Sequence, residues 1–122
     1  MSILADIVTR WKQNYPVQVW AGSVPNNTSP PYVVFTYASG GERRVAPSTV
    51  AWQEAVISFT ATANTSVDAE QFAEDARSLY DMKSFGAVAD MIMTNRSLYY
   101  TDNPSLTSNR IWVSQLDFAI KH

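Results

Sequence analysis

EAVISFTATANTSVDAE, residues 54–70, decides the fold because a strand pattern in it passes directly into a helix start. Apolar and polar side chains alternate through its first half, and a period of two puts one set of side chains on the core face of a strand. We expect this strand to span residues 50–63. Its core set is Ala55, Ile57, Phe59, Ala61 and Ala63, and Val56 is the exception on the polar face.

The second half of the stretch has the side chains that begin helices. Asp68 follows Thr65 by three residues, as in a capping box. We expect a helix over about residues 67–83, with Gly86 marking its exit. Its buried stripe is Phe72, Ala76, Leu79 and Tyr80, and its acidic residues are Asp68, Glu70, Glu74 and Asp75. Carboxylates suit the N-terminal half of a helix, which indicates a solvated face, with a contact surface for a basic partner as the alternative.

Further elements follow on both sides of this stretch. An amphipathic helix is expected over residues 3–13 and a short strand over 17–20, followed by a loop rich in Pro and Asn. YVVFTYA, residues 32–38, is typical of a buried strand, and the polar, glycine-containing segment 39–48 predicts a loop after it. Residues 88–100 and 108–121 predict a long hairpin. The order α-β-β-β-α-β-β predicts one α+β domain over residues 1–122, with an antiparallel or mixed sheet and both helices on one face.

Composition narrows the class of function. Charged residues make up 16% of the 122-residue chain, below the roughly 25% typical of soluble domains, which suggests surface buried against partners. The formal net charge is -2 and the only basic cluster is Arg43-Arg44, so general binding of nucleic acid by this chain is not expected. The sequence has neither a signal-peptide pattern nor an apolar run of about 20 residues, so we expect it to fold in a cytoplasm without a membrane partner.

No set of residues predicts catalysis. The chain has no cysteine, which excludes disulfides, thiolate zinc ligands and a cysteine nucleophile. Its single histidine, His122, is the last residue, and a chain end is poorly placed for acid–base chemistry. The sequence has no nucleophile elbow, phosphate loop or dinucleotide fingerprint. We therefore expect no enzyme activity, no cofactor and no metal site.

Two features predict contact surfaces instead. The loop expected at residues 39–48 combines two glycines with Glu42, Arg43 and Arg44. It is either an exposed hairpin loop with incidental charges or a loop that pairs with a neighbouring subunit or faces DNA. Core positions suit Trp11, Phe35, Phe59, Phe72 and Phe118. A second group of aromatic residues is difficult to bury together in so small a domain: Trp20, Tyr32, Trp52, Tyr99 and Tyr100. Because Trp and Tyr are enriched at interfaces, this group predicts an interface.

Taken together, four segments resemble the tail-completion or tail-terminator proteins of long-tailed bacteriophages. The first is an N-terminal helix before the short strand Val17–Trp20, and the second is the next strand, which starts with PPYVVF at Pro30–Phe35 and ends in Ser39-Gly40. The third is the long strand that enters a helix through NTSVDAE at 64–70. The fourth is the closing strand pair, which ends in LDFAI at 116–120. The resemblance covers nearly the whole chain as a pattern of elements. Met91-Ile92-Met93 departs from it, because that strand commonly has less methionine in the family.

The resemblance implies a structural virion protein without enzyme activity. Such proteins form a ring, commonly a hexamer, at the head-proximal end of the tail tube, where they stop tube polymerisation and join the tail to the neck and head. The partners implied are further copies of the chain, the tail tube protein, a neck or connector protein, and the sheath or a sheath-like terminator. Genomic DNA passes through the ring without specific binding. The protein would lie at the tail–neck junction of the virion, after assembly in the host cytoplasm.

A ring needs two unlike contact patches on each subunit, because its contacts are heterologous. The candidate segments are residues 22–31, 40–48 and 101–107. The candidate interface residues are Trp20, Asn26, Pro31, Tyr32, Glu42, Arg43, Arg44, Trp52, Asp102 and Leu106. The alternatives to a terminator are another tail or neck subunit, such as a tube protein, a sheath initiator or a head–tail adaptor, and a small ferredoxin-like binding module.

Overall fold

Two helices and one six-stranded sheet make up the fold, in a computed structural model that describes residues 3–25, 28–46, 49–86, 88–102 and 110–122. Residues 39–46, 49–53, 101–102 and 110 are described by their backbone only. The elements are α1 (Ile3–Asn14), β1 (Val19–Ala21), β2 (Tyr32–Ala46), β3 (Thr49–Ala63), α2 (Ser66–Tyr80), β4 (Lys83–Phe85), β5 (Val88–Asp102) and β6 (Arg110–Lys121). The predicted order of elements is confirmed, with β4 as an additional short strand.

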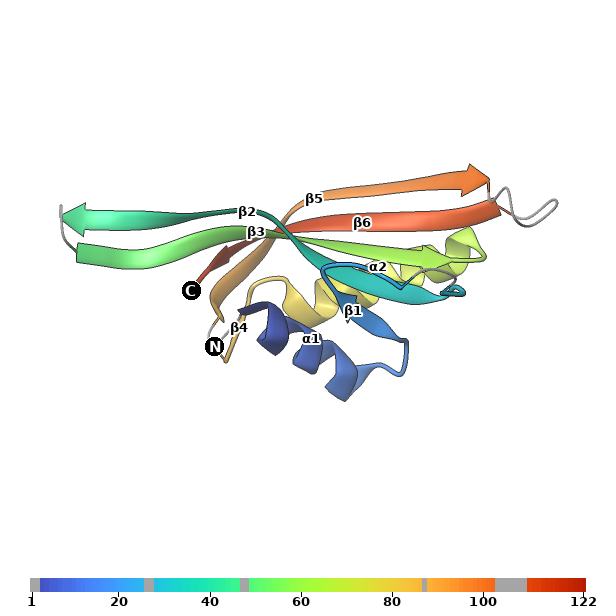
Figure 1. The fold of residues 1–122 in the computed structure, drawn as a ribbon, viewed down its shortest axis with the longest axis horizontal. Coiled ribbons are helices and arrows are strands. Elements are labelled where there is room, and N and C mark those ends of the chain that lie inside the picture. Colours follow the sequence, from blue (N-terminus) through green and yellow to red (C-terminus); the bar gives the residue numbers. More distant parts are fainter. Residues whose placement is uncertain (1–2, 26–27, 47–48, 87, 103–109) are drawn as a thin grey trace.

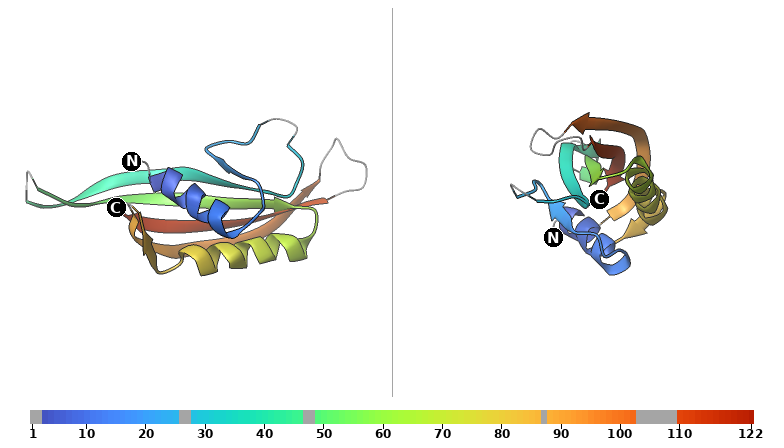
Figure 2. Two further views of the ribbon diagram at one scale, coloured as in Figure 1. Left: turned by 90° about the horizontal axis from the view of Figure 1, so that it is seen from below. Right: turned by 90° about the vertical axis from the view of Figure 1, so that its right-hand side faces the viewer.

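The strands form one mixed sheet in the order β1-β2-β3-β6-β5-β4. β1 pairs parallel with β2, and every other neighbouring pair is antiparallel. The sheet is curled, and α1 and α2 pack against the same face of it (Figure 1, Figure 2). We call this the helix-packed face, and the opposite one the open face. The predicted α+β class, with both helices on one face of a mixed sheet, is confirmed.

One hydrophobic core lies between the helices and the sheet. The alternation predicted for β3 is seen, since Ile57 and Phe59 are fully buried on the helix-packed face. α1 contributes Trp11, whose ring centroid lies 5.4 Å from that of Phe59, and α2 contributes Tyr80. The Tyr80 hydroxyl donates a 2.6 Å hydrogen bond to the Ile7 carbonyl, so the polar end of this buried ring joins the two helices. Large aromatic side chains thus supply much of the stabilising burial in a small core.

α2 begins where the capping pattern predicts and ends earlier than expected. Thr65 is the N-cap, and its hydroxyl accepts a 3.2 Å hydrogen bond from the backbone N–H of Asp68. The helix ends at Tyr80 rather than near residue 83, because Met82 takes a left-handed backbone conformation (φ 59°) and donates its N–H to the Met91 carbonyl of β5. β4 follows at once and pairs with the start of β5.

The prediction of a loop over residues 39–48 is wrong, because β2 continues to Ala46 and β3 begins at Thr49. Glycine and polar side chains favoured a loop at this place. The backbone of Gly40 nevertheless lies opposite Ala55, and β2 accommodates the unfavourable composition with shifts of register along the pair. Pairing with the next strand along the chain therefore outweighs the local turn signals.

The distal parts of β2 and β3 form a two-stranded extension, residues 42–46 and 49–53, which we call the arm. β3 pairs with β6 only as far as Glu54, which lies opposite Lys121. Beyond that pair β3 has β2 alone beside it, and the two strands project past the helices and the rest of the sheet (Figure 1). The arm therefore extends beyond the body of the domain.

The hairpin predicted for the C-terminal half is confirmed as β5 and β6, close to the expected ranges. The two strands pair along β5 with a bulge between Met93 and Asn95. β4 pairs with β5 only near its start, between Val88 and Met91. The rest of β5 therefore lies at an edge of the sheet.

Candidate interaction surfaces

The open face carries side chains from four neighbouring strands in register. One cross-strand row runs through Tyr32, Thr62, Val113 and Tyr99, on β2, β3, β6 and β5. Its two central members are buried, at 7% and 8% exposure, whereas Tyr99 at one end is 47% exposed. Neighbouring side chains on a curled sheet thus shield the centre of this face. Other open-face positions of the central strands are partly buried, and Glu54 and Lys121 are exposed.

Trp20 lies on the open face at the β1 edge, as the cross-strand partner of Val34. Its ring is partly buried, and its Nε1 atom is buried without a hydrogen-bond partner among the described residues. A buried N–H without an acceptor costs about 1–3 kcal/mol, and native chains seldom keep one. The β1 edge therefore holds a polar group whose hydrogen bond the described residues do not supply.

Pro31 and Tyr32 lead into β2 beside Trp20. Pro31 is exposed and follows a cis peptide bond from Pro30, and Tyr32 is partly buried on the open face. Gln18 fastens this segment to the start of β1, because its side-chain amide donates to the Pro31 carbonyl (3.1 Å). Three of the predicted interface residues, Trp20, Pro31 and Tyr32, thus lie at one corner of the sheet.

Four predicted interface residues, Glu42, Arg43, Arg44 and Trp52, fall in the arm. The backbone of Arg43 lies directly opposite that of Trp52. These positions belong to strands and not to the glycine loop that the sequence predicted. Pairing of this segment with a neighbouring subunit stays a prediction, and the strand geometry gives it a backbone edge through which to act.

The remaining predicted residues do not join either group. Asp102 ends β5, opposite Arg110 of β6, at the end of the long axis away from the arm (Figure 1). Asn26 and Leu106 lie outside the described residues. The predicted set is therefore divided among the β1 corner, the arm and the end of β5, and forms no single site.

The exposed part of β5 carries apolar side chains that sequence reasoning found only in part. Tyr99 and Tyr100, expected to be difficult to bury, are 47% and 50% exposed, and Leu98, which was not singled out, is 39% exposed. The Tyr100 ring packs on Trp112 with 5.2 Å between centroids. Exposed large apolar residues on an edge strand are typical of an association site. The sequence signal for this surface is the run of three consecutive large residues, Leu98, Tyr99 and Tyr100. In a strand with only one buried face, alternate residues are usually polar.

An ion pair joins this strand to α2. Arg96 of β5 donates to the Glu74 carboxylate, which also accepts from Arg77 on the next turn of the helix (3.1 Å). Hydrogen bonds from Arg96 and then Arg77 lower the pKa of Glu74 from its ordinary value. The acidic helix face, predicted to be simply solvated, therefore contains one residue that also holds β5.

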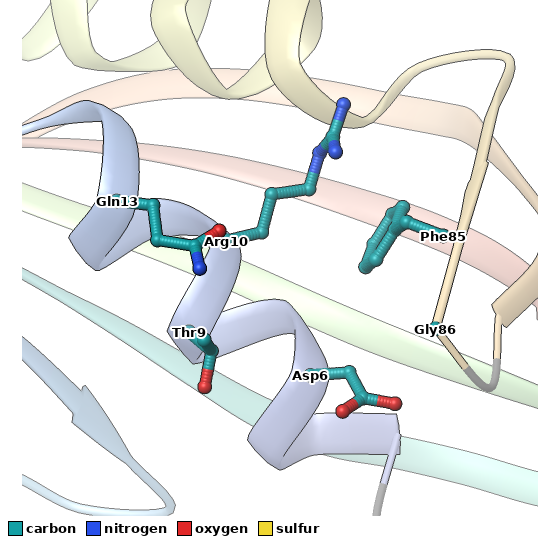
Figure 3. Close-up of a pocket in the computed structure, with 6 residues that line it drawn as sticks. All are labelled: Asp6, Thr9, Arg10, Gln13, Phe85 and Gly86. Carbon is teal, nitrogen blue, oxygen red and sulfur yellow. The ribbon is translucent and has the colours of Figure 1, made fainter.

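A small depression of about 190 Å³ lies between α1 and the end of β4, lined by Asp6, Thr9, Arg10, Gln13, Phe85 and Gly86 (Figure 3). Arg10 makes two contacts within the fold. Its Nε donates to the Leu79 carbonyl near the end of α2 (2.9 Å), and its guanidinium lies 4.7 Å from the centre of the Phe85 ring. Within the described ranges, no group of three or more His, Cys, Asp or Glu side chains is placed to hold a metal ion.

Comparison with models of known protein families and with curated proteins finds no match for this chain. In the part of the chain that the structure describes, no helix is long and apolar enough to cross a membrane. Three surface features stand out among the described residues: the β1 corner, the arm and the exposed part of β5.

Proposed function

We propose that this chain is a structural subunit of a bacteriophage tail, a terminator that forms a ring at the head-proximal end of the tail tube. The ring stops growth of the tube and provides the surface that joins the tail to the neck. Its partners are further copies of the chain, the tail tube protein, a neck or connector protein, and the sheath or a sheath-like terminator. The pattern of elements from the N-terminal helix to the closing strand pair supports this assignment.

The arm is the observation that carries the proposal. A two-stranded ribbon is at best marginally stable in water by itself. Residues 42–46 and 49–53 nevertheless continue as paired strands past Glu54 and Lys121, where β3 leaves β6. Such an extension gains stability when another surface packs against it. It therefore favours a protein that acts as one of several subunits.

A second, unlike surface favours a ring over a two-fold dimer. The exposed Leu98, Tyr99 and Tyr100 belong to β5, which is separated from β2 by β3 and β6 in the sheet. Two unlike patches on one chain make heterologous contacts. Such contacts close into a ring when a whole number of equal rotations from one subunit to the next completes a full circle. A net charge of -2 suits a ring through which DNA passes, because non-specific affinity for DNA requires a basic surface.

Electron microscopy of tail tubes assembled with and without the protein tests this function. We expect one ring of the protein at one end of each tube and a uniform tube length, whereas tubes without it continue to grow. Rings that stack by themselves into long tubes would favour a tube protein. A protein that binds neither end of the tube and leaves tube length unchanged contradicts the proposal.

A further inference from the structure

The arm and the end of β5 lie at opposite ends of the long axis of the molecule (Figure 1). β1 covers β2 only at Val33–Phe35, so none of the described strands lies beside residues 42–46 on that side. β4 covers β5 only between Val88 and Met91, so after its bulge β5 has β6 as its one neighbour among these strands. Each end therefore has an open strand edge, which presents backbone donors and acceptors that another strand can pair with.

Hydrogen bonds at the start of β5 show which backbone groups face away from β6. Met93 donates its N–H to Asp81 Oδ1 (2.9 Å), on the β4 side of the strand. After the bulge, the N–H of Arg96 donates to Asn95 Oδ1 (2.9 Å), so it also faces away from β6. Backbone groups alternate between the two sides of a strand, which places the N–H and C=O of Leu98 on the outer side.

The acidic half of α2 lies beside this part of β5. Ser114, the cross-strand partner of Leu98, donates its hydroxyl to the Ala69 carbonyl of the helix (2.8 Å). Farther along the helix, Glu74 forms its ion pair with the same strand. Glu70 is exposed and lies one turn before Glu74, so it shares that side of the helix. The open edge at Leu98 is therefore flanked by a carboxylate.

The arm has the complementary charge. It carries the only basic cluster of the chain, Arg43-Arg44. Complementary charges speed the encounter of two surfaces and help to select their register. The arm is also a two-stranded ribbon, which is marginally stable until a further strand or surface joins it. The arm is therefore suited to an open strand edge that lies beside acidic side chains.

Sheet order and strand direction determine how the two ends would meet. Among the four long strands, β2 and β5 lie on opposite flanks and run in opposite directions. Copies repeated head to tail, with their helices on the same side, keep these directions. The β2 strand of one arm then meets β5 of the next copy and runs antiparallel to it, which continues the pattern of the sheet.

We propose that residues 42–46 of the arm pair with the open edge of β5 around Leu98 of a second copy, and that this strand addition is the contact between neighbours in the ring. The inference rests on the proposed function for the closure of the ring. Each copy gives its arm to one neighbour and receives an arm from the other, so the contact is heterologous.

The free lengths of the two edges allow this pairing. With Arg44 opposite Leu98, Gly40 falls opposite Asp102, the last residue of β5. Val33–Phe35, the part of β2 that β1 occupies, then lies past the end of β5 and does not take part. The pairing therefore uses only backbone edges that are open in the single chain.

The same register places neighbouring copies end to end. The cross-strand row of Leu98 reaches β2 at Val33. Arg44 lies about ten paired positions farther along β2, which shifts the neighbour by roughly 33 Å at about 3.3 Å per residue. The strands would then run along the circumference of the ring. β2 has a bulge between Tyr37 and Ser39, and a bulge bends its strand, so the arm can turn relative to the body as a ring requires.

Cysteine cross-linking tests the pairing directly, since the chain has no cysteine of its own. We expect the double variant Arg44→Cys/Leu98→Cys, treated with a short bismaleimide, to give a ladder of multimers on a denaturing gel, and each single variant to stay monomeric. Absence of a ladder from the double variant would overturn the pairing. Dimers of the Leu98→Cys single variant would also overturn it, because like edges would then meet.

Arg44→Cys/Lys83→Cys is the matched control for the cross-link. Lys83 is exposed and lies on β4 opposite Met91, roughly 23 Å from Leu98 along β5 at about 3.3 Å per residue. We expect no ladder from this pair of cysteines. A ladder as strong as that of Arg44→Cys/Leu98→Cys would overturn the proposed register.

Removal of the arm tests its contribution to association. Gly41 and Glu54 are cross-strand partners, so a two-residue Asn-Gly turn can join them in place of residues 42–53. The core residues Trp11, Phe59 and Tyr80 lie outside the removed segment, and urea unfolding checks that the shortened chain folds. We expect association, measured by light scattering, to weaken by about tenfold or more, because several backbone hydrogen bonds are lost. Unchanged association of the folded shortened chain would overturn the proposal, and if that chain does not fold, the cross-linking result decides.

The outcomes distinguish this pairing from the proposed function. A cross-linked ladder without decoration of tube ends would support the strand addition and contradict the terminator function. Rings of the shortened chain at tube ends would support the function and overturn the pairing.

Discussion

Glu74 on α2 and Arg96 on β5 form an ion pair that fastens the helix to the edge strand immediately before its exposed part. Arg96 also follows the bulge in β5, and its backbone N–H is held by the side chain of Asn95. The position of α2 and the start of the open edge are therefore coupled through one residue. This contact joins segments 22 residues apart.

Replacing Glu74 with glutamine tests the ion pair through pH. The folded-state pKa of Glu74 lies below its ordinary value of 4.5, so the charged carboxylate stabilises the fold above that value and loses this effect as pH falls through the folded-state pKa. We expect Glu74→Gln to be less stable than the parent at neutral pH and as stable in strong acid, measured by urea unfolding. Glu70→Gln on the same helix is the control. An equal loss at both pH values would show that charge is not the cause.

Gly86 and Gly22 provide a matched pair for backbone strain. Both have positive φ, 49° and 85°, but a Cβ on Gly86 would lie 2.8 Å from Asp6 Oδ2, whereas one on Gly22 would meet nothing within 4 Å. We expect Gly22→Ala to lose about 1–2 kcal/mol of stability from the left-handed conformation alone. Gly86→Ala should lose more, because the clash adds to the strain. Denaturant unfolding of both variants measures the difference, and equal losses would contradict the close approach of α1 to the β4–β5 turn.

Tyr80 tests the contact between the two helices. Burial raises the pKa of its phenol well above the ordinary value, so the hydroxyl stays protonated and donates to the Ile7 carbonyl at 2.6 Å. We expect Tyr80→Phe to lose about 0.5–1.5 kcal/mol, the usual contribution of one hydrogen bond. Tyr15→Phe is the control, since the Tyr15 hydroxyl makes a longer bond of 3.4 Å to Asp75. If the two variants lose the same free energy of unfolding, the short bond has no special weight.

The local sequence pattern predicted the elements that depend on neighbouring residues alone, namely the buried face of β3 and the start of α2. The period of two placed Ile57 and Phe59 in the core, and the capping side chain of Thr65 placed the start of α2. The end of α2 was not predicted, because it depends on a hydrogen bond from Met82 to Met91 on another strand. The strand at residues 39–46 was missed for a similar reason, since its pairing with β3 places Gly40 opposite Ala55 despite the loop-like composition.

The candidate surfaces were predictable only as residue types. An excess of aromatic residues indicated an interface, and Tyr99 and Tyr100 are indeed exposed. Their grouping on an open edge follows from the strand order β6-β5-β4, which no local pattern specifies. Which side of β5 the backbone groups of Leu98 face depends in turn on the bulge after Met93.

The mass of the purified protein in solution, measured by light scattering over a range of concentrations, tests most directly the claim that this chain works as a closed ring of identical copies. For a hexamer of the 13.6 kDa chain, we expect a single species of about 82 kDa that persists on dilution. A strict monomer of 13.6 kDa at every concentration would contradict the account.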